Sequence, residues 1–158
     1  MPNKVYMQEE TPITWAASGG TYALTLSSVS AGAVRVGEQG DLGAAPRAGR
    51  YAWRYVNDSF GSAPTVGQTV DVYWASGDGT YTDGNVGTSD AAGSTVALPN
   101  LLRLGSATVQ TTSTTDDIIV SGIVELGARY GAPVIDNNTS VAITGGRFIL
   151  TPIPDEIQ

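Results

Sequence analysis

Short runs in which apolar and polar residues alternate, separated by glycine-rich turns, restrict the fold of this chain more than any other feature of its sequence. Alternation with a period of two places successive side chains on opposite faces of a β-strand. One run divides into an aromatic face and a basic face: Tyr51, Trp53 and Tyr55 against Arg50 and Arg54. This run predicts a strand whose aromatic face lies in a core.

A second alternating run, at residues 69–74, gathers its apolar side chains on one face in the same way. Because only a loop containing Gly and Pro separates the two runs, they are expected to pair as antiparallel neighbours. Residues 107–111 and 117–124 flank a polar segment, and they predict a hairpin for the same reason. The chain is therefore expected to be built from antiparallel strand pairs.

Four further strand candidates lie at residues 21–26, 33–36, 140–143 and 146–150. Helix signal is confined to one short turn at residues 99–105, which has Pro near its start and Gly at its end. About seven to nine short strands with almost no helix predict an all-β fold, either an antiparallel β-sandwich or a jelly roll. Periodicity leaves a closed barrel open as the alternative.

The chain of 158 residues is expected to form one domain with an arm at each end. The predicted sandwich covers residues 13–150, and the predicted arms are residues 1–12 and 151–158. Both arms carry prolines and acids, which suit an extended path better than a core strand. Frayed termini are the alternative interpretation of these segments.

The sequence contains no histidine and no cysteine. These absences remove the imidazole base, the thiolate nucleophile and most ligand sets for transition metals. A serine nucleophile needs a base, and the single lysine, Lys4, lies in the predicted N-terminal arm. We therefore expect a protein that is not an enzyme, with no catalytic residues, no cofactor and no bound metal.

The charge balance argues against two classes of partner. Eight basic and fifteen acidic residues give a net charge of −7, whereas nucleic acids and anionic membranes are bound by basic surfaces. No apolar stretch is long enough for a transmembrane helix, and the first residues lack the apolar region of a signal peptide. We therefore expect a protein that is made in a cytoplasm and binds neither nucleic acids nor membranes.

Acidic residues occur in several places that could hold a site. Asp78, Asp83 and Asp90 lie in a glycine-rich loop at residues 76–90, and oxygen ligands on such a loop suit calcium. Their spacing does not match the calcium loop that ends in a bidentate glutamate, so a solvated surface loop is the simpler interpretation. An ion or a glycan at this loop remains open.

Two acidic residues on predicted strands, Asp71 and Glu125, are a further candidate pair for catalysis. Each alone is most simply an exposed side chain. Aromatic residues could instead form a sugar-binding platform. Trp53 and Trp74 are in phase with apolar neighbours and are expected in the core. Tyr81 is then the one aromatic residue that the loop is expected to display.

The only basic cluster consists of Arg47, Arg50 and Arg54. Arginines on one strand face could pair with acids of a neighbouring subunit, and the C-terminal arm offers candidate partners in Asp155 and Glu156. The prolines of that arm, Pro152 and Pro154, would lower the cost of ordering it on docking. We therefore predict a subunit interface at these seven residues, with salt bridges inside one chain as the alternative.

Four segments of the sequence resemble small structural proteins of tailed bacteriophages with long, non-contractile tails. They are VGEQGDLGAAPR at residues 36–47, YAWR at 51–54, SGIVE at 121–125 and RFILTPIPDE at 147–156. The resemblance extends over most of the chain, as a similar general character and a few short segments. It includes no catalytic motif.

The resemblance implies a capsid decoration or cement protein, which is made in the host cytoplasm and located on the virion. Such a protein binds the major capsid protein on the outside of the shell, bridges its subunits and assembles as a homotrimer. A tail component, or a carbohydrate-binding β-sandwich displayed on the virion, is the alternative.

Overall fold

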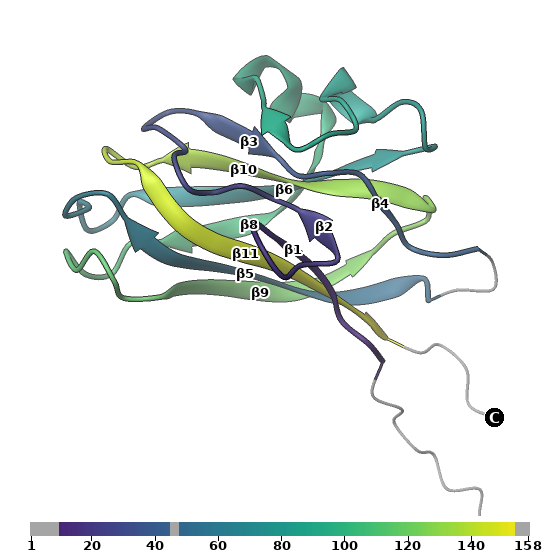
Figure 1. The fold of residues 1–158 in the computed structure, drawn as a ribbon, viewed down its shortest axis with the longest axis horizontal. Helices are drawn as coiled ribbons and strands as arrows, with labels where there is room; N and C mark the ends of the chain where they lie inside the picture. The colour runs from purple at the N-terminus through teal and green to yellow at the C-terminus, as the bar shows by residue number, and fades with distance from the viewer. Residues whose placement is uncertain (1–9, 45–47, 154–158) are drawn as a thin grey trace, which may run out of the picture.

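The computed structural model describes residues 10–44 and 48–153, in which two β-sheets lie face to face around one core (Figure 1). Sheet A has five strands in the spatial order β2, β1, β11, β5 and β9. Their bounds are Ile13–Ala16 for β1, Tyr22–Ala23 for β2, Arg50–Phe60 for β5, Ile118–Glu125 for β9 and Ile143–Ile153 for β11.

Sheet B has six strands, five of them in the order β7, β3, β10, β6 and β8, with β4 also paired to β10. Their bounds are Val34–Val36 for β3, Gly40–Asp41 for β4, Thr69–Gly77 for β6, Ala91–Ala92 for β7, Leu102–Thr108 for β8 and Tyr130–Asn138 for β10. The expected all-β sandwich is therefore confirmed.

The strand pairing is nested along the chain. β6 pairs with β8, β5 with β9, β3 with β10 and β1 with β11, and every one of these pairs is antiparallel. Such nesting describes one long antiparallel ribbon that is folded back on itself and wound into two sheets, which is the jelly-roll arrangement. The closed barrel left open by the sequence pattern is not formed.

Two of the expected strand pairs are wrong. The aromatic strands β5 and β6 do not pair with each other, because β5 belongs to sheet A and β6 to sheet B. The expected hairpin of β8 and β9 is divided between the sheets in the same way. In a jelly roll the chain crosses from one sheet to the other at these points, so the paired apolar faces meet across the core instead of side by side.

Aromatic rings from both sheets fill the centre of the sandwich. Trp15 lies edge-on to Trp74, with ring centroids 5.6 Å apart, and edge-on to Phe148 at 5.8 Å. The two alternating runs point inward as predicted, since Tyr51, Trp53, Tyr55, Val70, Val72 and Trp74 are all buried. Edge-to-face contacts of this kind add to the stabilisation that comes from burying the rings.

Two glycines make room for the indole of Trp53 between β9 and β8. A Cβ on Gly122 of β9 would lie 2.9 Å from Trp53 Nε1, and a Cβ on Gly105 of β8 would lie 3.1 Å from Cη2 of the same ring. These distances are shorter than normal van der Waals contact, so a side chain at Gly122 would displace a buried ring. Glycine at this position is therefore a packing requirement.

A separate segment covers part of the outer face of sheet B. Residues 83–100 include the short 3₁₀ helices η1 (Asp83–Asn85) and η2 (Thr95–Asn100), and Figure 1 shows them above β3 and β10. Leu98 and Leu101 pack there against Val34, Val36 and Val134 in a second, smaller hydrophobic cluster. The short turn expected at residues 99–105 is wrong in its position, since η2 ends at Asn100 and residues 102–108 form β8.

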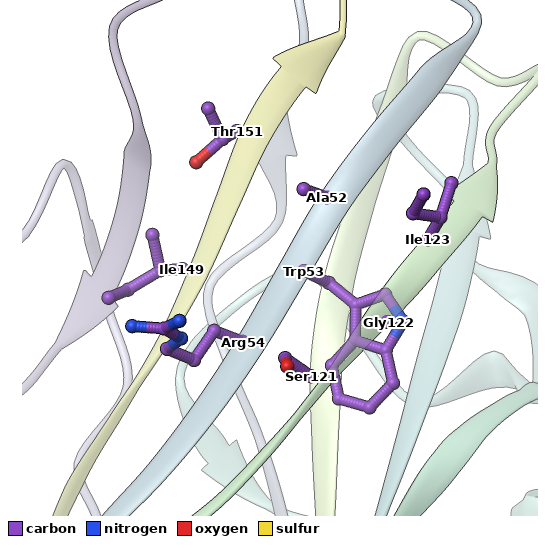
Figure 2. A pocket seen from close by; sticks show the side chains of 8 residues that line it. All are labelled: Ala52, Trp53, Arg54, Ser121, Gly122, Ile123, Ile149 and Thr151. Atoms are coloured by element: carbon purple, nitrogen blue, oxygen red, sulfur yellow. The ribbon is translucent and has the colours of Figure 1, made fainter.

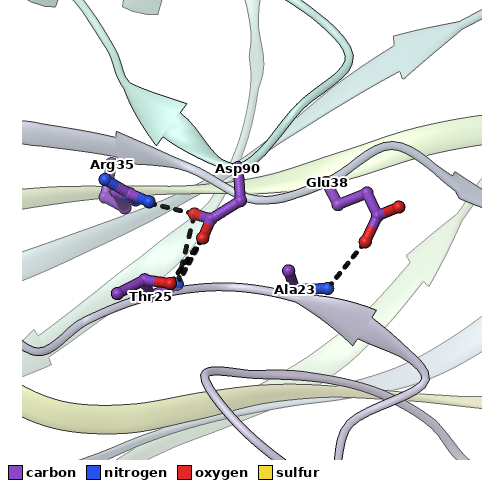
Figure 3. A network of polar contacts seen from close by, with 5 residues as sticks. All are labelled: Ala23, Thr25, Arg35, Glu38 and Asp90. Carbon is purple, nitrogen blue, oxygen red and sulfur yellow. Dashed lines mark hydrogen bonds and ion pairs between the residues drawn. The ribbon is translucent and has the colours of Figure 1, made fainter.

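Asp90 fastens this covering segment to the rest of the fold (Figure 3). Its carboxylate accepts a hydrogen bond from Arg35 Nε at 2.7 Å and from Thr25 Oγ1 at 2.5 Å. Burial raises the pKa of Asp90, but the hydrogen bonds from Arg35 and Thr25 outweigh it and hold the pKa below its usual value. Close by, Glu38 accepts a hydrogen bond from the backbone N–H of Ala23 at 2.9 Å.

The last strand extends further than the expected arm boundary. β11 continues through Thr151 to Ile153, and Pro152 lies opposite Tyr51 of β5. β1 pairs with β11 only as far as Leu150, so Pro152 stands where the strand has a partner on one side alone, a position that tolerates its missing N–H. Neither 3₁₀ helix in the described part of the chain is long and apolar enough to cross a membrane.

Replacing Gly122 should destabilise the core. We expect Gly122→Ala to lower the free energy of unfolding by about 1–3 kcal/mol, because the new methyl group overpacks Trp53. Gly127→Ala is the matched control, since a Cβ there would meet no atom within 4 Å. Urea denaturation measures both variants, and equal stabilities would contradict the tight packing of Trp53 against β9.

Removing the Asp90 carboxylate should change how stability depends on pH. Because the pKa of Asp90 is lower in the folded than in the unfolded chain, its contribution is present above about pH 4 and is lost as the pH falls through the folded pKa. We expect Asp90→Asn to cost about 1–3 kcal/mol at pH 7 and progressively less below pH 4. Urea denaturation across this pH range measures the difference, and a constant difference would contradict this role.

Candidate functional site

The outer face of sheet A exposes several apolar side chains. A depression of about 500 Å³ lies on it where β11, β5 and β9 run side by side (Figure 2). We call this surface the open face, and its outward side chains are Ala52, Arg54, Ser121, Ile123, Ile149 and Thr151. Unlike the outer face of sheet B, it has no second hydrophobic cluster of described residues above it.

The strand alternation explains why apolar side chains point outward here. In β9, Ile118 is buried, whereas Ile119 and Ile123 lie on the opposite face and expose 54% and 68% of their surface. Single exposed apolar residues are common on proteins, whereas a group of them on one face of a sheet is typical of a binding surface. Sequence reasoning missed this group, because both faces of this strand are rich in apolar residues.

The depression itself is lined mostly by uncharged side chains. Arg54 is the only charged side chain that lines the depression, although the chain as a whole carries a net charge of −7. Figure 2 shows its side chain extending from β5 toward Ile149 of β11. Within the described residues, the Arg54 side chain makes no hydrogen bond or ion pair, so its guanidinium remains available to an acidic partner.

The predicted interface residues divide into two groups. Arg50 and Arg54 share the outer face of β5, opposite Tyr51, Trp53 and Tyr55, as the alternation predicted. Pro152 lies in β11 as described above. The other four predicted residues lie outside the described residues: Arg47, Pro154, Asp155 and Glu156. Pairing between the arginines and the acidic C-terminal residues therefore stays a prediction.

The carboxylate pair considered from sequence does not form. Asp71 lies on the outer face of sheet B and Glu125 on the outer face of sheet A, so the sandwich separates them. Asp71 instead lies directly opposite Asp136 of β10. Like charges at directly opposed positions of neighbouring strands are destabilising, so this pair requires compensation.

Polar neighbours compensate for the charge of Asp71 and Asp136. Ser106 Oγ and Arg103 Nη2 both donate to Asp71 Oδ1, the latter at 3.3 Å, and Asn138 Nδ2 donates to Asp136 Oδ2 at 2.8 Å. Asp136 Oδ1 is buried and has no hydrogen-bond partner. Burial raises the pKa of Asp136, the bond from Asn138 opposes this shift, and the charge of Asp71 adds to it. Asp136 therefore binds a proton more readily than an isolated aspartate.

The acidic loop does not bring its carboxylates together. Asp78 accepts hydrogen bonds at 2.8 Å from the backbone N–H groups of Thr80 and Tyr81 in its own turn, whereas Asp90 faces Thr25 and Arg35. Among residues 10–44 and 48–153, no three acidic side chains cluster in a way that could hold a metal ion. Tyr81 is displayed as expected, with 71% of its surface exposed.

Neutralising Asp136 should remove a pH-dependent penalty on folding. A pKa that is raised in the folded chain means that Asp136 costs stability as the pH rises through its folded pKa. We expect the stability of Asp136→Asn relative to the unmodified chain to improve as the pH rises above about 4, and to level off once the pH exceeds the folded pKa of Asp136. Asp116→Asn, at an exposed position, is the control, and parallel pH profiles from urea denaturation for all three proteins would contradict the expectation.

No family model matches the chain, and no curated protein matches it either.

Proposed function

We propose that this chain is a non-enzymatic structural protein of a virion that binds the outer surface of a capsid. In this role it bridges subunits of the major capsid protein and stabilises the shell, as a decoration or cement protein does. The observation that supports the proposal most is the open face, which presents Ile123 and Ile149 around Arg54, a side chain with no partner among the described residues. An apolar surface with one cationic group at its centre is suited to binding another protein rather than to holding a reacting substrate.

The jelly-roll fold is compatible with this role, but the fold alone does not identify the function. Jelly rolls occur in viral capsid proteins, and they also occur in lectins and in enzymes. The proposal therefore depends on the surface and on the absence of histidine and cysteine from the sequence. It agrees with the resemblance to structural proteins of long-tailed bacteriophages.

The energetics of a shell favour weak, repeated contacts. Burying one exposed isoleucine side chain contributes about 1.5–3 kcal/mol, and Arg54 adds orientation toward an acidic partner. A single contact of this size binds weakly. Many copies on one particle, each bridging two or more capsid subunits, raise the total stabilisation by multivalency, and a homotrimer provides three such contacts in one unit.

A carbohydrate-binding role is the second candidate, and one observation favours it. Tyr81 lies beside a depression of about 300 Å³, to which Asp78, Thr82 and Asp83 contribute polar atoms. An exposed ring with carboxylates and a hydroxyl nearby is suited to stacking against a sugar and hydrogen-bonding its hydroxyl groups. Retention of the chain on a host polysaccharide, lost in Tyr81→Ala, would favour this candidate.

Capsid binding can be tested with one change on the open face. We expect the purified chain to co-sediment with expanded capsids, and Ile149→Asp to weaken this binding by about tenfold or more, because a carboxylate replaces a buried apolar contact. Val96→Asp is the matched control, since Val96 is also apolar and 82% exposed but lies on η2 over the other sheet. Equal binding of the two variants would contradict the role of the open face.

A cryo-EM reconstruction of the source particle locates the protein directly. Regular density for the jelly roll on the outer shell is the expected result. Density confined to the tail would replace the proposal with a tail component, and its absence from the particle would overturn both.

A further inference from the structure

Four strands stand at the ends of the two sheets, and they differ in how well they are protected. β2 and β7 contain two residues each, which is too short to act as a template for another strand. β8 and β9 contain seven and eight residues. A long edge strand presents unpaired backbone N–H and C=O groups, and soluble proteins protect such strands with charge, proline or a bulge.

β8 has two of these protections. Its register against β6 shifts between Val72 and Tyr73, which marks an irregularity in the strand. It also carries Arg103, whose guanidinium is exposed and bonded to Asp71. Both features disfavour the regular addition of another strand at this edge.

β9 has neither protection. It pairs with β5 without any register shift from Ile118 to Glu125, and it contains no proline and no basic residue. Its only charged residue, Glu125, is the last residue of the strand. The outward side chains Ile119 and Ile123 are exposed and apolar. Within the described residues, β9 is therefore the one long, regular and nearly uncharged edge.

We propose that β9 pairs in antiparallel fashion with β9 of a second copy of this chain, across a twofold axis at Ile123. Sheet A then continues from one molecule into the other. In this register Ile123 meets Ile123 of the second copy on the open face, and Ser121 lies opposite Glu125 of the second copy. The unpaired backbone groups of both edges are satisfied by each other, as in other strand-addition complexes.

Charge complementarity selects this register. Ser121 is the β9 neighbour of Arg54, so Glu125 of the second copy stands two strand spacings, about 10 Å, from Arg54. Among the described residues neither side chain makes a hydrogen bond or ion pair, although Glu125 lies directly opposite Arg50 in its own chain. The Arg54 side chain is long enough to cross the small Ser121 and reach that carboxylate, and the twofold axis creates the contact twice.

The neighbouring register is less favourable. A twofold axis at Ser121 would place Ile119 opposite Ile123 of the second copy, which is good apolar packing. It would also place Asp117 opposite Glu125 of the second copy at both ends of the strand pair. Opposed like charges are destabilising, and Arg54 would gain no acidic partner.

This inference goes beyond the proposed function, because the strand pair forms between free copies and needs no capsid. An isologous contact closes on itself, so it produces a dimer with twice the 16.3 kDa mass of the chain. A homotrimer would need a different, heterologous contact. On a shell, the β9 pair would link neighbouring assemblies of the protein.

Engineered cysteines test both the contact and its register. The chain has no cysteine, so any disulfide in a single-cysteine variant joins two molecules. Directly opposed strand residues have Cα atoms about 4.5–5.5 Å apart, which suits a disulfide. We expect Ile123→Cys to form a covalent dimer under mild oxidation, and Ser121→Cys and Val96→Cys to stay monomeric on non-reducing gels.

Each alternative outcome is decisive. Efficient cross-linking of Ser121→Cys instead of Ile123→Cys would overturn the proposed register. Equal cross-linking of all three variants would mean random collision and would overturn the contact itself, as would no cross-linking at all. Circular dichroism and thermal unfolding confirm that each variant is folded.

Sedimentation equilibrium of the unmodified chain provides a second test without engineered cysteines. We expect a reversible monomer–dimer equilibrium, which Ile123→Asp weakens by about tenfold or more by placing two carboxylates on the axis. Val96→Asp should leave it unchanged. A monomer at every concentration would overturn the proposal, whether or not the chain binds capsids.

Discussion

The packing of large aromatic rings between two sheets is the constraint on which the rest of this structure depends. Trp15, Trp74 and Phe148 come from three different strands, and their rings meet at the centre of the sandwich. The sheets accommodate rings of this size because glycines stand where an indole approaches the backbone, as Gly122 and Gly105 do around Trp53. Positions without side chains on the inner faces are therefore as important to the core as the rings themselves.

The two outer faces of the sandwich have different roles. Sheet B is partly covered by the segment that contains η1 and η2, which Asp90 holds in place through Arg35 and Thr25. Its remaining outer surface carries the Asp71–Asp136 pair with its polar neighbours. No described residue covers the open face of sheet A in this way, and it presents isoleucines around one arginine. This asymmetry gives the molecule one surface suited to assembly and one that is largely closed.

The alternation of apolar and polar residues predicted which side chains of a strand point inward. It did not predict which strands lie side by side. The inward and outward faces of β5 were correct, because aromatic and basic residues differ strongly along that strand. The partners of β5 and β8 were wrong, because a period of two does not say which strand lies beside another. The Asp71–Asp136 pair was not foreseen, because it depends on the register between strands that are distant in sequence. Both faces of β9 are apolar, so its exposed side gave no signal.

The position of β11 has a consequence for how the molecule folds. β11 is the last described strand in the chain, yet it stands at the centre of sheet A, between β1 and β5. Its partner β1 comes from the other end of the described sequence, so the central pairing of this sheet joins the most distant segments of the ribbon. Closing such a long loop is slow, and until β11 docks the aromatic residues of β1 and β5 lack the neighbours that β11 supplies. A ribosome must therefore release β11 before the core can close, and the interval before closure is when this protein is most exposed to aggregation and to chaperones.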